Sequence, residues 1–204
     1  MSSPHAAAAP PMLSVEGAVA RITLARPEQH NAIEAADVER IHAHLDRIDA
    51  EPSVRVLILT GRGPTFCAGA SLREIESGEM TGALFERLTD RLASTRVPAL
   101  CALNGSVYGG GTEIALCCDF RIGVVGTRMS VPAARLGLCY PVGGLRRYVE
   151  ALGLGVASRL LLASEEMDAE DMLGVGFLHQ LVPEDDLSSA ADALAARLAS
   201  LAPL

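Results

Sequence analysis

Two glycine-rich turns are the parts of this sequence whose residue types and spacing could support catalysis. Each follows a run typical of a buried strand and precedes a helix-like segment; they are Phe66-Cys-Ala-Gly-Ala-Ser-Leu72 and Tyr108-Gly-Gly-Gly-Thr-Glu113. Backbone N–H groups at a helix start have no partner within the helix, so two such turns facing one another could donate two hydrogen bonds to one developing negative charge. Glu113 would lie in the first turn of its helix, where a carboxylate could act as general acid or base.

Other readings of these turns are weaker. A Gly-Gly-Gly run before a helix is also typical of a tight packing corner, and neither nucleotide-binding glycine pattern is present. Ser71 resembles a hydrolase nucleophile, but Arg73 stands where that sharp turn needs glycine. Cys67 has no visible base beside it, and His42 and His44 point to opposite sides of a helix. We therefore expect neither a reactive thiol nor a metal site.

The composition excludes further classes of function. All 17 cationic side chains are arginine, and 25 carboxylates give a formal net charge of −8. Without lysine, the chain offers no lysine Schiff base and no P-loop. An acidic chain with 3% aromatic residues lacks the basic groove and stacking platforms of nucleic-acid binders. Because no apolar run is long enough to span a bilayer and the five cysteines show no C-x-x-C pair, we expect no membrane partner and a reducing, cytoplasmic location.

The alternation of strand-like and helix-like segments predicts one α/β domain over residues 13–204, after a disordered leader over residues 1–12. Asn31 is predicted to cap the first helix, whose apolar face repeats at helical spacing. Strands are predicted over 18–24, 54–60, 97–103, 119–125 and 177–182, and helical segments within 72–95 and over 112–117, 146–152, 156–162, 169–173 and 187–201.

Short motifs also follow one another in a definite order. They are Ala25-Arg-Pro-x-x-x-Asn-Ala32, Val-Leu-Ile-Leu-Thr-Gly at 56–61, the first glycine-rich turn, Asn104-Gly105 with the second turn, Cys118-Asp119, Leu136-Gly137 and Gly143-Gly144. No single motif is specific, but the ordered set resembles the crotonase (enoyl-CoA hydratase/isomerase) superfamily. The resemblance extends over nearly everything from Leu13 to the end of the chain.

The resemblance implies a spiral of repeated ββα units that acts on acyl-CoA thioesters. An enolate intermediate would be held by the backbone N–H groups of Ala70 and Gly110, in agreement with the two turns, and Glu113 would be the acid/base. It further implies a homotrimer or hexamer and no permanently bound cofactor, since coenzyme A enters as part of the substrate. The family's usual C-terminal helical segment is apparently absent or cut short at Leu204. Expected substrate-binding positions are Arg26, Ala68, Ser71, Leu72, Arg73, Gly109, Pro132, Ala133 and Leu138.

One departure from the family pattern affects the chemistry. Hydratases carry a second glutamate after a proline, and this chain has Pro132-Ala133 there. Addition of water needs one group to activate the water and one to manage the proton, so Glu113 would have to do both. Three reactions remain open: slow hydration, a double-bond shift by a single acid/base, and decarboxylation. A non-catalytic acyl-thioester binder is a further alternative.

Tyr140 bears on that choice. The string Leu136-Gly-Leu-Cys-Tyr140 is similar to a segment of methylmalonyl-CoA decarboxylases, in which the tyrosine lies at the active site and the second glutamate is likewise absent. Tyr140 is thus a candidate proton donor or carboxylate contact, although it could equally pack with its hydroxyl in water. Those decarboxylases carry a histidine where this chain has Ala70.

Two further positions differ from the family pattern in charge or side chain. The family's usual aspartate after the first oxyanion residue is Ser71, which could still cap the helix. Family lysines near the nucleotide are replaced by arginine, so Arg73 and Arg26 are the expected contacts of the coenzyme A phosphates.

Overall fold

A six-stranded sheet forms the larger layer of the protein, whose computed structural model describes residues 9–202. Its first two strands are antiparallel and all other neighbours are parallel. The strand order is β1 (Met12–Glu16), β2 (Val19–Leu24), β3 (Val56–Gly61), β5 (Ala99–Leu103), β7 (Phe120–Val124) and β10 (Gln180–Val182). A smaller sheet has the order β4 (Thr65–Cys67), β6 (Ser106–Tyr108), β8 (Arg128–Ser130) and β9 (Glu166–Asp168).

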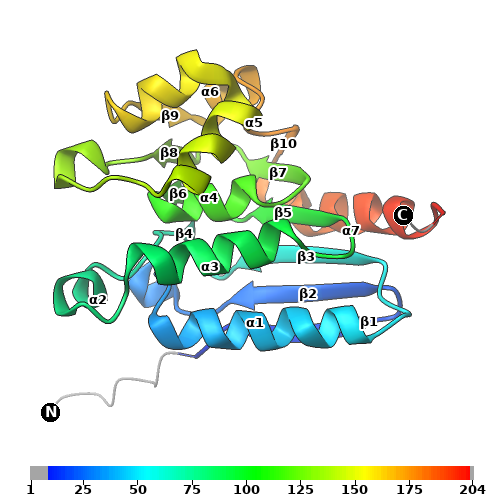
Figure 1. Cartoon of the computed structure of the whole chain (residues 1–204). Coiled ribbons are helices and arrows are strands. Elements are labelled where there is room, and N and C mark those ends of the chain that lie inside the picture. Colours follow the sequence, from blue (N-terminus) through cyan, green and yellow to red (C-terminus); the bar gives the residue numbers. More distant parts are fainter. Residues whose placement is uncertain (1–8, 203–204) are drawn as a thin grey trace, which may run out of the picture.

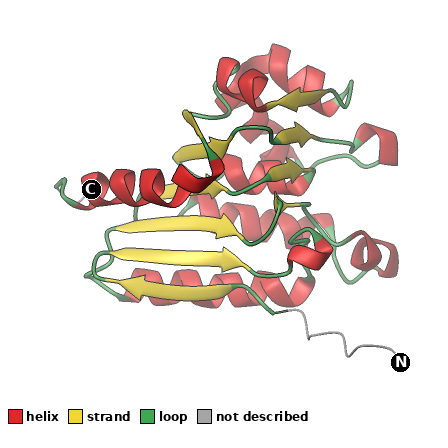
Figure 2. Cartoon of the chain, turned by 180° about the vertical axis from the view of Figure 1, so that it is seen from behind, coloured by secondary structure: helices red, strands yellow, loops and turns green. Residues whose placement is uncertain are grey.

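Helices cover both faces of the larger sheet (Figure 1). On one face α1 (Ala35–Ala50) packs beside α3 (Gly82–Ala93), and on the other α7 (Leu187–Ala199) crosses β3, β5 and β7, as the reverse view shows (Figure 2). The other helices are α2 (Leu72–Ser77), α4 (Gly110–Leu116), α5 (Val142–Leu161) and α6 (Ala169–Gly174). Within residues 9–202 no helix is both long and apolar enough to cross a membrane.

The residues of β3 explain why both faces are covered. Leu57 and Leu59 belong to the apolar cluster that includes residues of α1 and α3, whereas Val56 and Ile58 belong to the cluster that includes residues of α7. Because successive side chains of a strand point to opposite faces, a strand that is apolar at each position must be buried on both. Each large apolar side chain contributes about 1.5–3 kcal/mol to folding when fully buried.

A repeated strand–strand–helix unit confirms the predicted fold class and brings distant segments together. β3 and β4 precede α2, β5 and β6 precede α4, and β7 and β8 precede α5. In each unit the first strand joins the larger sheet and the second joins the smaller one. Since β4, β6 and β8 are parallel neighbours, the turns that follow them lie at one edge of the smaller sheet. Both glycine-rich turns are among them.

Two parts of the fold differ from the prediction. The smaller sheet was not predicted, because its strands have three residues each and carry too little pattern to recognise. The predicted leader is too long: residues 1–8 lie outside the described residues, but the Pro11 carbonyl accepts a hydrogen bond from His44 Nε2 at 2.9 Å, and β1 begins at Met12. The break predicted between the helical pieces over 146–152 and 156–162 is confirmed, since α5 is kinked at Gly153, whose φ of +76° is not helical.

Asn31 does not cap α1, contrary to the prediction. Glu34 occupies the N-cap position and forms a reciprocal capping box with Asp37. Asn31 is buried instead, and its amide accepts a hydrogen bond from the Arg26 N–H at 2.9 Å and donates to the carbonyls of Arg62 and Thr65 at 2.9 and 2.7 Å. It therefore joins the start of the first helical segment to the turn between β3 and β4.

Replacing Asn31 by alanine is expected to lower the free energy of unfolding by about 2–4 kcal/mol, because buried polar groups lose their partners. Its φ of 54° adds to the cost, since alanine adopts this region less readily than asparagine. Urea denaturation of the variant and of Gln29→Ala, an exposed neighbour, measures the difference. Equal unfolding midpoints for the two variants would contradict this role of Asn31.

Candidate active site

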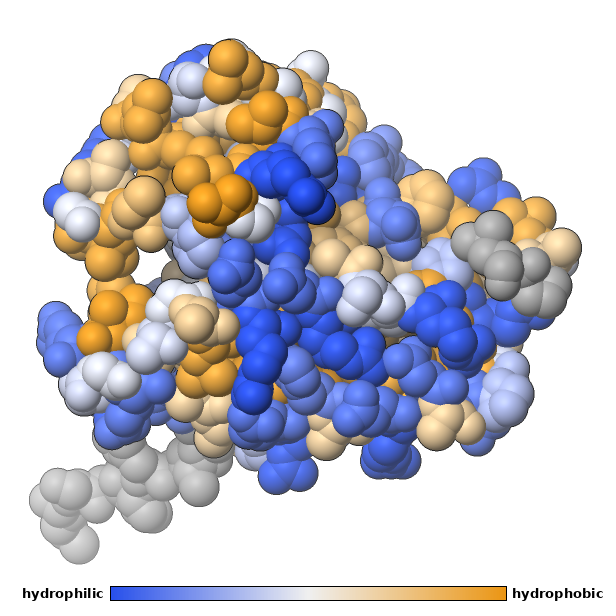
Figure 3. Space-filling view, in the orientation of Figure 1, coloured by the Kyte–Doolittle hydropathy of each residue, from blue (hydrophilic) through white to orange (hydrophobic). Residues whose placement is uncertain are grey.

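A cavity of about 800 Å³ opens beside the two glycine-rich turns. Its wall also includes residues of α2, α3 and the segment after β8, and Figure 3 shows apolar residues gathered around a hollow on this side of the molecule. Many of the predicted site residues line it: Ala68, Ala70, Leu72, Gly109, Gly110, Glu113, Pro132, Ala133, Leu138 and Tyr140. The structure therefore brings together residues that are up to 72 positions apart in the sequence.

The first turn leaves one N–H group free at the cavity. Gly69 accepts a hydrogen bond from the Ile33 N–H at 2.8 Å, and Ser71 donates to the Ile33 carbonyl at 2.8 Å, so these bonds fix the backbone on both sides of Ala70. Among the described residues, no group accepts a hydrogen bond from the Ala70 N–H itself. Ala70 itself lines the cavity.

The second turn likewise leaves the N–H group of Gly110 without a partner among the described residues. Its predecessor, Gly109, donates to the Ser130 carbonyl at 2.9 Å, and Gly110 is the first residue of α4, where no earlier carbonyl of the helix is available. The turns touch: a Cβ placed on Gly69, whose φ is +86°, would lie 2.5 Å from the Gly110 nitrogen. Only glycine permits both this φ and this approach.

Glu113 lies one turn into α4, and its carboxyl group is buried at the cavity wall. Its Oε1 accepts a hydrogen bond from Nη1 of Arg147 on α5 at 2.9 Å. Burial raises the pKa of Glu113, and the Thr89 hydroxyl and the Arg147 charge partly oppose that rise. Gly144 of α5 faces the same carboxyl, since a Cβ there would lie 3.0 Å from Oε2.

Ala133 and Tyr140 also line the cavity. Ala133 is only 7% exposed, and among the lining residues, all within the described part of the chain, Glu113 is the sole carboxylate. The Tyr140 ring packs edge-on against Tyr148 with centroids 5.7 Å apart. Burial raises the pKa of Tyr140, so its hydroxyl keeps its proton at neutral pH.

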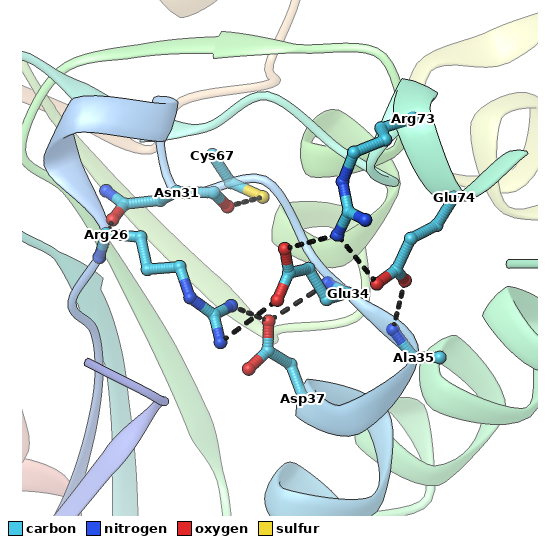
Figure 4. A network of polar contacts seen from close by, with 8 residues as sticks. All are labelled: Arg26, Asn31, Glu34, Ala35, Asp37, Cys67, Arg73 and Glu74. Carbon is cyan, nitrogen blue, oxygen red and sulfur yellow. Dashed lines mark hydrogen bonds and ion pairs between the residues drawn. The ribbon is translucent and has the colours of Figure 1, made fainter. Parts of the chain in front are cut away.

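Three predicted contacts do not line the cavity. The guanidinium of Arg26 is buried, where it pairs with Asp37 and, at 3.4 Å, with Glu34, so we withdraw it as a phosphate contact (Figure 4). Ser71 stands at the N-cap of α2, but its hydroxyl makes no capping hydrogen bond. The side chain of Arg73 is 71% exposed and pairs with Glu34 and Glu74 at 3.2 and 3.3 Å.

Two cysteines near the candidate site differ in exposure. Burial raises the pKa of the Cys67 thiol to about 12, and the thiol donates to the Asn31 carbonyl at 3.2 Å (Figure 4). Cys67 is therefore a packing residue, as predicted. Cys139, by contrast, is exposed at the cavity rather than buried.

Comparison with known sequences identifies the family. A sequence model described as enoyl-CoA hydratase/isomerase matches residues 14–204. The chain belongs to the enoyl-CoA hydratase/isomerase family. It is 31% identical to a short-chain-enoyl-CoA hydratase of Clostridium acetobutylicum over 95% of this chain and 76% of that protein. It is also 29% identical to a 2,3-dehydroadipyl-CoA hydratase of Escherichia coli over 95% of this chain and 77% of that protein.

Solved structures of enoyl-CoA hydratases have the same fold. The enzyme of Bacillus anthracis superposes with a TM-score of 0.88 at 29% identity, over 95% of this chain and 78% of the other. That of Mycobacterium tuberculosis gives a TM-score of 0.84 at 32% identity, over 95% of this chain and 83% of the other.

Arg147 is the residue that sequence reasoning missed at this enoyl-CoA hydratase/isomerase site. It belongs to no motif, and it pairs with a carboxylate 34 residues earlier in the chain. A weak signal was available: Gly144 and Arg147 are three residues apart on one helix, so they share a face, and Gly143-Gly144 was already a recognised motif.

Proposed function

We propose that this protein is an enzyme that acts on acyl-CoA thioesters through an enolate. The observation that carries this proposal is the meeting, in one cavity, of a single buried carboxyl group and two backbone N–H groups that have no partner among residues 9–202. The N–H groups of Ala70 and Gly110 would stabilise the negative charge on the thioester oxygen, each contributing on the order of 3 kcal/mol. Glu113 would take a proton from the acyl chain and return it.

A double-bond shift is the reaction whose proton balance one carboxylate satisfies. Glu113 would take the C-2 proton of a 3-enoyl thioester, the electrons would move onto the oxygen to give a dienolate, and Glu113 would return the proton to C-4 as a 2-enoyl thioester forms. Hydration would be slower, because Ala133 supplies no second carboxylate to share the work on water. The names of the relatives support an enoyl-CoA substrate in either case.

Decarboxylation is the second candidate, and Tyr140 favours it. Its protonated hydroxyl lines the same cavity, where it could contact a substrate carboxylate or protonate the enolate left when carbon dioxide departs. This reaction would need the oxyanion donors but no carboxylate base.

An activity panel tests these proposals. The purified protein is incubated with crotonyl-CoA, a 3-enoyl-CoA and methylmalonyl-CoA, and products are separated by chromatography. Isomerisation faster than hydration supports the single-carboxylate mechanism, and carbon dioxide release from methylmalonyl-CoA supports the second candidate. If no thioester is turned over but coenzyme A still binds, the protein is an acyl-thioester binder. A structure with bound acyl-CoA should place the thioester oxygen about 3 Å from the N–H groups of Ala70 and Gly110.

Arg73 is the proposed contact of the coenzyme A phosphates. Its side chain is 71% exposed although the guanidinium pairs with Glu34 and with the buried Glu74, so a phosphate can reach the guanidinium and compete for it. We expect Arg73→Ala to weaken coenzyme A binding about three- to tenfold at low salt and less at high salt, because salt screens exposed charges. Calorimetric titration at two salt concentrations measures this, with Arg87→Ala, an exposed ion-paired arginine on α3, as the matched control. Unchanged affinity at low salt would exclude the contact.

Three further features belong to the proposal. Coenzyme A would arrive and leave as part of the substrate, with no permanently bound cofactor. The assembly would be a homotrimer or hexamer, as the family resemblance implies, and the location would be the cytoplasm.

A further inference from the structure

The carboxyl group of Glu113 is held from behind by an arginine that does not line the cavity. Nη1 of Arg147 donates to Glu113 Oε1 at 2.9 Å and to Thr89 Oγ1 at 3.1 Å, while its Nη2 pairs with Asp90. The side chains are 3% exposed for Glu113, 16% for Arg147 and 63% for Asp90. A polar chain therefore runs from solvent through Arg147 to the buried carboxyl.

The two oxygens of that carboxyl have different surroundings. Oε1 is engaged by Arg147, whereas Oε2 accepts no hydrogen bond from the described residues. One turn before Arg147, Gly144 lacks a side chain at the point where a Cβ would approach Oε2 to 3.0 Å. The same helix thus fixes one oxygen and leaves room around the other.

From this geometry we propose that Arg147 is the positioning residue of the site: it anchors Oε1 of Glu113 and places a positive charge beside the carboxyl, so that Oε2 is the atom that takes the proton from the acyl chain. The exchange of a proton at Oε2 rests on the proposed function. The anchoring itself is a property of the free protein and can be tested without substrate.

The groups around Glu113 support a large effect of Arg147. Burial and the negative charge of Glu86 on α3 raise the pKa of Glu113, and the Thr89 hydroxyl and the Arg147 cation oppose that rise. The other titratable groups that interact with Glu113, all neutral in their usual state, are Cys117, Tyr140 and Tyr148. An adjacent opposite charge lowers a carboxyl pKa by about one to three pH units, so loss of Arg147 removes that effect.

The experiment is a titration of the Glu113 carboxyl by infrared difference spectroscopy, with the band assigned by its loss in Glu113→Gln. We expect Arg147→Met to raise the midpoint by about one to two pH units. Arg147→Lys should restore most of the difference because it keeps the charge. Arg146→Met is the matched control, since Arg146 is the exposed neighbour that pairs with Glu150 and has no contact with Glu113.

A midpoint in Arg147→Met equal to that of Arg146→Met would overturn the proposal. If the methionine variant does not fold, Arg147→Gln replaces it in the test. Glutamine keeps a hydrogen-bond donor but not the charge, so the proposal requires that this variant also raise the midpoint of the Glu113 titration. In a protein that turns over acyl-CoA, the low-pH limb of kcat/KM should move upward with the midpoint, because the reaction requires the ionised form. Failure of the proposed function would instead appear as no turnover by the parent protein, with the titration unaffected.

Discussion

Glu113→Gln is expected to reduce isomerisation or hydration of enoyl-CoA by about 10²–10⁴-fold, the usual contribution of a general acid/base. Glutamine keeps the shape and can still accept a hydrogen bond from Arg147, but it cannot take a proton. The effect should be large because Glu113 is the only carboxylate among the described residues of the cavity wall, so no neighbour can replace it. Steady-state kinetics and exchange of the C-2 proton of an acyl-CoA with deuterated solvent measure the loss.

A control variant and a binding measurement separate loss of the acid/base from other effects of the substitution. Glu79→Gln, at an exposed carboxylate, controls for the loss of one negative charge. The affinity for coenzyme A should be nearly unchanged in Glu113→Gln, because the acyl end and not the nucleotide meets this residue. A variant that converts crotonyl-CoA as fast as the parent protein would exclude Glu113 as the acid/base. Retained release of carbon dioxide from methylmalonyl-CoA, with loss of proton exchange, would favour decarboxylation with Tyr140.

The residues that the sequence singled out at the centre of the candidate site lie in local motifs, and the structure brings them to one cavity. Each glycine-rich turn contains its own candidate donor, and Glu113 follows Gly110 by less than one helical turn, so no long-range information is needed to propose them. That the turns meet follows from the repeat: their preceding strands, β4 and β6, are neighbours in the smaller sheet. The resemblance supplied this arrangement, since three-residue strands are too short to be recognised from pattern alone.

The surroundings of the site could not be predicted from local pattern, because they depend on pairings between distant residues. Arg26 and Arg73 look alike as candidate phosphate contacts, yet one is buried against Asp37 and the other is 71% exposed. The sequence favours Asn31 as the cap of α1, yet tertiary hydrogen bonds to Arg62 and Thr65 engage Asn31, and Glu34 stands at the N-cap. The burial of each residue and its tertiary partners determine its role, and neither can be predicted from the local sequence.

Gly69→Ala is expected to lower turnover by about 10²–10³-fold, the loss that follows removal of one oxyanion donor. The added methyl group would lie 2.5 Å from the backbone nitrogen of Gly110, so the two turns must separate and the Gly110 N–H must move away from the thioester oxygen. The backbone cannot relieve this contact easily, because hydrogen bonds with Ile33 hold Gly69 and Ser71 in place. Turnover, coenzyme A affinity and thermal stability of the variant are measured together.

Gly126→Ala separates this loss from simple backbone strain. Gly126 has a φ of +81°, close to the +86° of Gly69, but a Cβ there would meet nothing within 4 Å. Both variants should therefore lose about 1 kcal/mol of stability from the unfavourable φ, while only Gly69→Ala loses activity. If the two variants lose activity equally, strain and not the approach of the turns is responsible. If Gly69→Ala keeps the parent rate, the Gly110 N–H is not a donor to the thioester oxygen, since that donor could not have kept its position.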